Sequence, residues 1–196
     1  MVPTSPQGET RPLRRDAAVN RARVLAAAAE VFHEQGLTAG LDDVARRAGV
    51  GVGTVYRRFP TRDALMEALL ADLLDAYATE ADRALALPGG SGLAEFVRTV
   101  GEVQATPRGC ALRLWSSPAA DVRHAELHVL MVALLDDGKR HGTCRDDVTV
   151  GDLVGILIAL RAVREAPAAR VELDWRRHLE LCLVGLRPEQ GPLGRG

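Results

Sequence analysis

Aromatic side chains are scarce in this sequence: Phe, Tyr and Trp make up 4% of its 196 residues. β-Strands favour aromatic and β-branched residues, whereas Ala, Leu and Arg, which are abundant here, favour helices. We find no strand pattern and no internal repeat. Hydrophobic residues make up 47% of the chain, so a packed core is expected and wholesale disorder is not. The sequence therefore predicts an all-α fold.

Cysteines and long apolar runs are also few. The three cysteines, Cys110, Cys144 and Cys182, lie far apart and include no CxxC pair, which argues against a secreted disulfide framework. Residues 1–12 lack the apolar stretch of a signal peptide. The longest apolar run, residues 153–160, is far shorter than the ~20 residues that a membrane span needs. We therefore expect a cytoplasmic protein with no membrane partner.

Lysine is almost absent, because Lys139 is the only one and every other basic side chain apart from histidine is arginine. The charge is also unevenly distributed. Residues 1–62 hold ten arginines and six acidic residues, a balance of +4, whereas the remainder holds 15 basic and 20 acidic residues, a balance of −5. This asymmetry suits an N-terminal segment that binds nucleic acid, joined to a body that does not.

Apolar residues recur at helical spacing along most of the chain and indicate about nine helices. Gly36 should end the first helix and Thr61 should cap the fourth. The sequence PGGSG at residues 88–92 is the clearest internal break. The predicted helices span about residues 16–35, 42–48, 52–58, 62–87, 93–105, 107–115, 122–141, 150–163 and 173–186.

The segment 36–59, GLTAGLDDVARRAGVGVGTVYRRF, has the features of a helix-turn-helix. Gly49 permits a tight turn with positive φ between two short helices. Ala45 and Val55 are small enough for those helices to cross closely. In such a motif the second helix enters the major groove with its N-terminus first. Gly51 and Gly53 would leave the backbone at that end free to approach DNA.

Residues 20–70, and above all the stretch DDVARRAGVGVGTVYRRFPTRDALMEAL, resemble the DNA-binding domain of the TetR family. The remainder matches that family only in its helical layout. The resemblance implies a DNA-binding transcriptional regulator, a homodimeric repressor released from palindromic double-stranded DNA by a small-molecule effector. It implies no enzymatic activity and no cofactor. The alternative is a helical small-molecule-binding protein or enzyme with a non-functional helix-turn-helix.

The resemblance also implies a domain organisation. We expect a disordered arm at residues 1–15 and an N-terminal three-helix helix-turn-helix DNA-binding domain at residues 16–62. A C-terminal helical ligand-binding and dimerisation domain should follow at residues 63–187, with a disordered tail at 188–196. Arginines in the arm could reach into a minor groove, or could simply be solvated.

DNA contacts are expected chiefly from the second short helix. By resemblance, Tyr56 and Arg58 would bind phosphates, and Thr54 or Arg57 would read bases, since arginine pairs well with guanine. The alternatives are a solvated helix face for the arginines and packing against the first helix for Tyr56. The predicted DNA-binding residues are Arg46, Gly51, Gly53, Thr54, Tyr56, Arg57, Arg58 and Arg62.

The body should supply a dimer interface and an effector pocket. The run 153–160 is apolar almost all round, which requires burial on more than one side. The predicted dimer residues are Leu153, Leu157, Leu160, Trp175, Leu179, Cys182, Leu183 and Leu186. The predicted ligand-binding residues are Tyr77, Gln104, Arg113, Trp115, His128 and Met131, each of which could instead belong to the core.

A metal site is not predicted. His124 and His128 are four residues apart on a predicted helix, a spacing that could direct two imidazoles to one metal ion. No third ligand has a suitable spacing, so a solvated helix face is the better interpretation.

Overall fold

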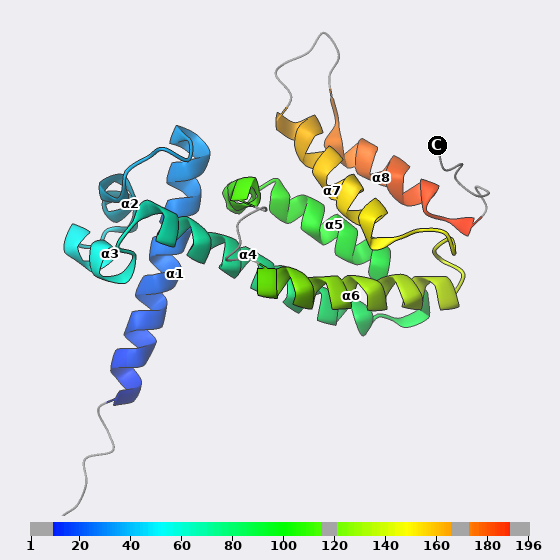
Figure 1. The fold of residues 1–196 in the computed structure, drawn as a ribbon, viewed down its shortest axis with the longest axis horizontal. Helices are drawn as coiled ribbons and strands as arrows, with labels where there is room; N and C mark the ends of the chain where they lie inside the picture. The colour runs from blue at the N-terminus through cyan, green and yellow to red at the C-terminus, as the bar shows by residue number, and fades with distance from the viewer. Residues whose placement is uncertain (1–9, 115–120, 166–172, 189–196) are drawn as a thin grey trace, which may run out of the picture. The chain divides into compact units, whose positions relative to one another are not determined.

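The computed structural model describes residues 10–114, 121–165 and 173–188 (Figure 1). These residues form eight α-helices and two short 3-10 helices, and no strand occurs among them, which confirms the all-α prediction. The helix predicted at residues 107–115 is a 3-10 helix. The elements are α1 (Thr10–Gln35), α2 (Leu41–Ala48), α3 (Val52–Arg58), α4 (Arg62–Leu85), η1 (Pro88–Gly90), α5 (Gly92–Gln104), η2 (Pro107–Leu114), α6 (Asp121–Arg140), α7 (Val150–Glu165) and α8 (Trp175–Gly185).

The chain divides into two compact units, residues 1–69 and 70–196. The division falls within α4, whereas the sequence favoured a boundary after residue 62. Helix α1 begins at Thr10, before the start at residue 16 that the apolar spacing indicated. Arg11, Arg14 and Arg15 therefore lie in the first turns of α1, so the described part of the expected arm is helical.

In the first unit, the turn at Gly49 sets the geometry of α2 and α3. Gly49 has φ of +64°, the left-handed region that favours glycine. The Val50 N–H donates to the Ala45 carbonyl at 3.1 Å across this turn. Arg23 of α1 donates from Nη2 to the Ala48 carbonyl at 2.8 Å, which satisfies a carbonyl at the end of α2. Helix α1 therefore stabilises the turn between α2 and α3 through the Arg23 side chain.

Helices α1 and α2 are also joined by an ion-pair cluster. Arg47 donates to Glu30 at 2.8 Å and to Glu34 at 2.6 Å. The start of α4 is fixed in turn by Thr61, whose Oγ1 accepts a hydrogen bond from the Ala64 N–H at 3.1 Å. This contact confirms the predicted N-cap.

In the second unit, α5 is the central helix. It contacts η2, α6, α7 and α8, and Figure 1 shows α6 beside it on one side and the α7–α8 pair on another. Gly92 allows a close approach at its start, because a Cβ there would collide with the Ala84 carbonyl. Its buried apolar side chains are Leu93, Phe96, Val97 and Val100.

Two glycine substitutions in the helix-turn-helix should have opposite effects on stability. Gly49→Ala should lower the free energy of unfolding by about 1–2 kcal/mol, because the left-handed backbone is costly for a residue with a Cβ. Gly53→Ala should raise it by roughly 0.5–1 kcal/mol, because alanine is the better helix former and its Cβ would meet no atom within 4 Å. Urea denaturation followed by circular dichroism measures both. Equal effects of the two substitutions would contradict this account of the turn.

Candidate nucleic-acid interface

Helix α3 turns one side chain inward and the rest outward. Val55 is fully buried, and Phe59, the residue after the helix, is also buried. The other residues of α3 are exposed, among them Thr54, Tyr56 and Arg58. Tyr56 is 45% exposed, so it does not pack as a core residue. The helix is thus anchored on one side and free on the other.

The N-terminus of α3 is not crowded by side chains. A Cβ on Gly53 would meet nothing within 4 Å, and one on Gly51 would lie 3.8 Å from Thr54 Oγ1. Both glycines have exposed positions. Packing within the protein therefore does not require glycine at either position, and the absence of side chains leaves the backbone at this helix end open to a large partner.

Among the described residues, the contacts of the predicted DNA-binding arginines lie at the protein surface. Arg57 donates from Nη2 to Thr54 Oγ1 at 3.3 Å. Arg46 pairs with Asp43 at 2.9 Å but remains 76% exposed, and Arg62 lies 3.7 Å from Asp63. Exposed pairs of this kind contribute little to stability. A phosphate could therefore compete for these guanidinium groups at small cost.

A shallow recess of about 130 Å³ lies between α1 and α3. Asn20 and Arg21 of α1 line it together with Thr54 and Arg58 of α3. Sequence reasoning missed the two α1 residues, because no local motif indicates which part of a long helix lies beside α3. They extend the polar surface around α3.

The predicted ligand-binding residues do not all come together. Tyr77 and Gln104 are buried in the second unit, each only 4% exposed, and Met131 is also buried. His128 is exposed on α6. Trp115 and the side chain of Arg113 lie outside the described residues.

Two arginines that sequence reasoning missed lie close to Tyr77 and Gln104. Arg164 of α7 donates to the backbone carbonyl of Gln104. Burial raises the pKa of Tyr77, and the charges of Arg108 and Arg164 oppose that rise. The group therefore combines buried hydrogen-bonding side chains with positive charge.

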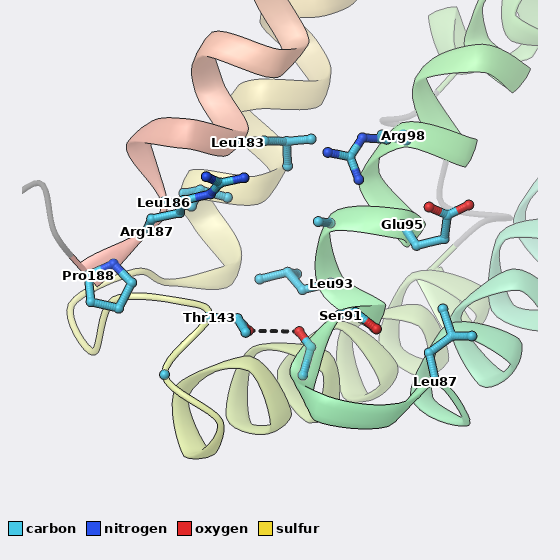
Figure 2. A pocket seen from close by; sticks show the side chains of 13 residues that line it. Leu87, Ser91, Leu93, Glu95, Arg98, Thr143, Leu183, Leu186, Arg187 and Pro188 are labelled. Carbon is cyan, nitrogen blue, oxygen red and sulfur yellow. Dashed lines mark hydrogen bonds between the residues drawn. The ribbon is translucent and has the colours of Figure 1, made fainter.

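A different hollow, of about 460 Å³, lies between the start of α5 and the end of α8 (Figure 2). None of the predicted ligand-binding residues lines it. Several of its polar groups already have partners: Thr143 donates to the Gly90 carbonyl at 2.7 Å, and Ser91 donates to the Pro88 carbonyl at 2.8 Å. Arg98, which also lines it, donates to both carboxylate oxygens of Glu180, at 2.7 and 3.0 Å.

Most of the predicted dimer residues are buried within the single chain. Leu153, Leu160, Leu179, Leu183 and Leu186 have at most 7% of their surface exposed. These leucines belong to the core of the second unit, so their side chains are not available to a partner. Leu157, Trp175 and Cys182 are half-buried. The large apolar side chains that remain exposed on these two helices are Ile158, Leu181 and Val184.

The described parts of the chain contain neither a metal-binding cluster nor a candidate membrane span. No group of three or more His, Cys, Asp or Glu side chains there could hold a metal ion. Across the same residues, the structure contains no helix whose length and apolar character would suit a membrane crossing.

Two family models match the chain. One, described as "Bacterial regulatory proteins, tetR family", matches residues 24–69, which include the helix-turn-helix. The other, "Transcriptional regulator SbtR-like, C-terminal domain", matches residues 88–188. No curated protein sequence matches the chain.

Solved structures agree with the family models. The TetR transcription regulatory protein from Mycobacterium vanbaalenii is 34% identical with a TM-score of 0.68, over 90% of this chain and 99% of that one. The TetR transcriptional regulator SCO0520 from Streptomyces coelicolor is 32% identical with a TM-score of 0.64, over 86% and 98%. The chain belongs to the TetR family of DNA-binding transcriptional regulators.

Proposed function

We propose that the chain is a repressor that binds a two-fold-symmetric operator as a homodimer and is released when a small molecule binds its second unit. The observation that carries the DNA-binding half is the surface of α3, where Val55 alone is buried and Thr54, Tyr56, Arg57 and Arg58 are exposed. Hydroxyl, phenol and guanidinium groups can form hydrogen bonds with both phosphates and base edges.

Dimerisation follows from the small size of α3. A helix of seven residues offers few contacts, so two copies on neighbouring half-sites are needed for a specific complex. Ile158 of α7 is 52% exposed, and Leu181 and Val184 of α8 are 60% and 41% exposed. Since α7 and α8 contact each other, these apolar side chains are our candidates for the centre of the interface.

Release would operate through a shift between two conformers. A ligand changes such an equilibrium only by binding one conformer more tightly than the other. The buried group around Tyr77 and Gln104 is the candidate effector site, because the Tyr77 hydroxyl and Gln104 Oε1 are buried without a hydrogen-bond partner in the protein. Buried polar groups ordinarily have one.

The operator should have two-fold symmetry. Selection of bound fragments from random DNA, followed by footprinting, should yield paired half-sites with centres about 34–36 Å apart or a multiple of that distance. Affinity should fall steeply with salt, because phosphate contacts release counterions. A footprint without two-fold character would contradict the dimeric reading, and weak binding that leaves no footprint would favour a helical protein without operator recognition.

Three arginine substitutions should separate phosphate contacts, base contacts and internal pairing. Arg58→Ala should weaken binding to all sites equally, since phosphates carry no sequence information. Arg57→Ala should relax preference at one base position by about 1–3 kcal/mol. Arg47→Ala is the matched control and should bind operator like the parent, because the Arg47 guanidinium is already paired with Glu30 and Glu34. Anisotropy with operator variants measures all three, and parental binding by both α3 variants would refute the assignment of α3.

Charge introduced at an exposed position should dissociate the dimer, whereas charge at a buried one should unfold the second unit. Leu181→Glu should give a folded monomer with at least tenfold weaker operator binding. Leu183→Glu, two residues along α8 and 5% exposed, should lower the free energy of unfolding by several kcal/mol, because it buries an unpaired charge. Sedimentation and circular dichroism distinguish the two effects. A Leu181→Glu variant that remains dimeric would place the interface elsewhere.

A further inference from the structure

Four polar side chains come together inside the second unit from four different elements. Tyr77 belongs to α4, Gln104 to the end of α5, Arg108 to η2 and Arg164 to α7. Arg164 reaches the Gln104 carbonyl, and both arginines act electrostatically on Tyr77. Segments up to 87 residues apart in sequence therefore supply a single polar cluster.

Two of these groups lack a hydrogen-bond partner within the protein. The Tyr77 hydroxyl and Gln104 Oε1 are both fully buried and unpaired, and each whole residue is only 4% exposed. A buried polar atom without a hydrogen-bond partner destabilises the folded protein, because it has lost its water and gained nothing in return. Phenylalanine and leucine would avoid that cost at these positions. A ligand that hydrogen-bonds to both atoms removes it.

The cluster also contains two arginines, and among the described residues only one of them forms an ion pair with a carboxylate. Arg108 donates from Nη2 to Asp72 Oδ2 at 2.7 Å, so that charge is matched. Within the described residues, no carboxylate forms an ion pair with Arg164, which donates instead to the neutral backbone carbonyl of Gln104. Burial lowers the pKa of Arg164, although the charge of the adjacent, exposed Glu165 opposes that change. A single anionic group would balance Arg164.

Apolar side chains adjoin the cluster. Gly101 lies one turn before Gln104 on α5, and a Cβ placed there would lie 3.2 Å from Leu179, 3.3 Å from Trp175 and 3.8 Å from Leu160. Aliphatic and indole carbon atoms therefore pack closely against α5 one turn before Gln104, so the side chains that adjoin the cluster on this side are apolar.

We infer that this site binds an aliphatic carboxylate that also carries a hydroxyl group. The carboxylate pairs with Arg164, where a charge-assisted hydrogen bond is strongest. The ligand hydroxyl donates to Gln104 Oε1 and accepts from the Tyr77 hydroxyl, so both unpaired atoms gain a partner. The inference rests on the proposed function only in calling this ligand the effector.

The test uses the full chain and three probes: 3-hydroxyoctanoate, its methyl ester and octanoate. Calorimetric titration should show that the ester, which lacks the charge, and octanoate, which lacks the hydroxyl, each bind at least tenfold more weakly than the hydroxy acid. Failure of the hydroxy acid to bind, or equal binding of acid and ester, would overturn the inference.

Substitutions locate the interaction. Arg164→Gln should abolish the preference for acid over ester, and Arg164→Lys should restore part of it. Arg161→Gln, on the same helix and also half-buried, is the matched control and should behave like the parent. Tyr77→Phe should leave the melting temperature of the free protein unchanged or higher, because no hydrogen bond is lost, yet reduce affinity for the hydroxy acid at least fivefold. A parental affinity in Tyr77→Phe or Arg164→Gln would refute the assigned contacts.

Operator binding is measured separately, so that the two claims can fail independently. Release of DNA by the ester but not by the acid would leave the proposed function intact and overturn the ligand class. Binding of the acid by a protein that recognises no operator would do the reverse.

Discussion

The left-handed turn at Gly49 is the constraint on which presentation of α3 depends. A helix of seven residues cannot sustain itself in water, because isolated helices of that length are unstable. Its position comes instead from the turn, from Arg23 bound to the Ala48 carbonyl at 2.8 Å, and from burial of Val55 and Phe59. These few contacts fix one face of α3, so the opposite face can be polar without cost to the core.

The arginines of the first unit divide by what surrounds them. Arg47 is engaged by two glutamates and joins α2 to α1, whereas Arg57 and Arg58 are exposed on α3. Arginines on α2 and α3 thus have different roles, because Arg47 faces the glutamates of α1 whereas Arg57 and Arg58 face solvent. Arg57 and Arg58 thus contribute positive charge at a surface that a polyanion can reach.

Local signals predicted the first unit well. The bounds of α3 match the prediction, and Thr61 caps α4, because both depend on residues adjacent in sequence. The second unit was harder to predict. Leu183 and Leu153 form an apolar pattern that fits either a dimer interface or a core, and only their burial in the folded chain shows that they are core. Arg164 gave no local signal at all, since its relation to Gln104 depends on the packing of α7 against α5.

The central claim, that α3 enters the major groove, is tested most directly by tethered cleavage. An iron chelate attached to a cysteine at position 60 (Pro60→Cys), an exposed residue just after α3, in a chain whose half-buried Cys182 is changed to serine, would generate hydroxyl radicals beside the C-terminal end of α3. We predict two clusters of strand cleavage on operator DNA, related by a two-fold axis and centred in successive major grooves. Cleavage no stronger than that by free chelate, or a pattern spread evenly along the duplex, would contradict the account.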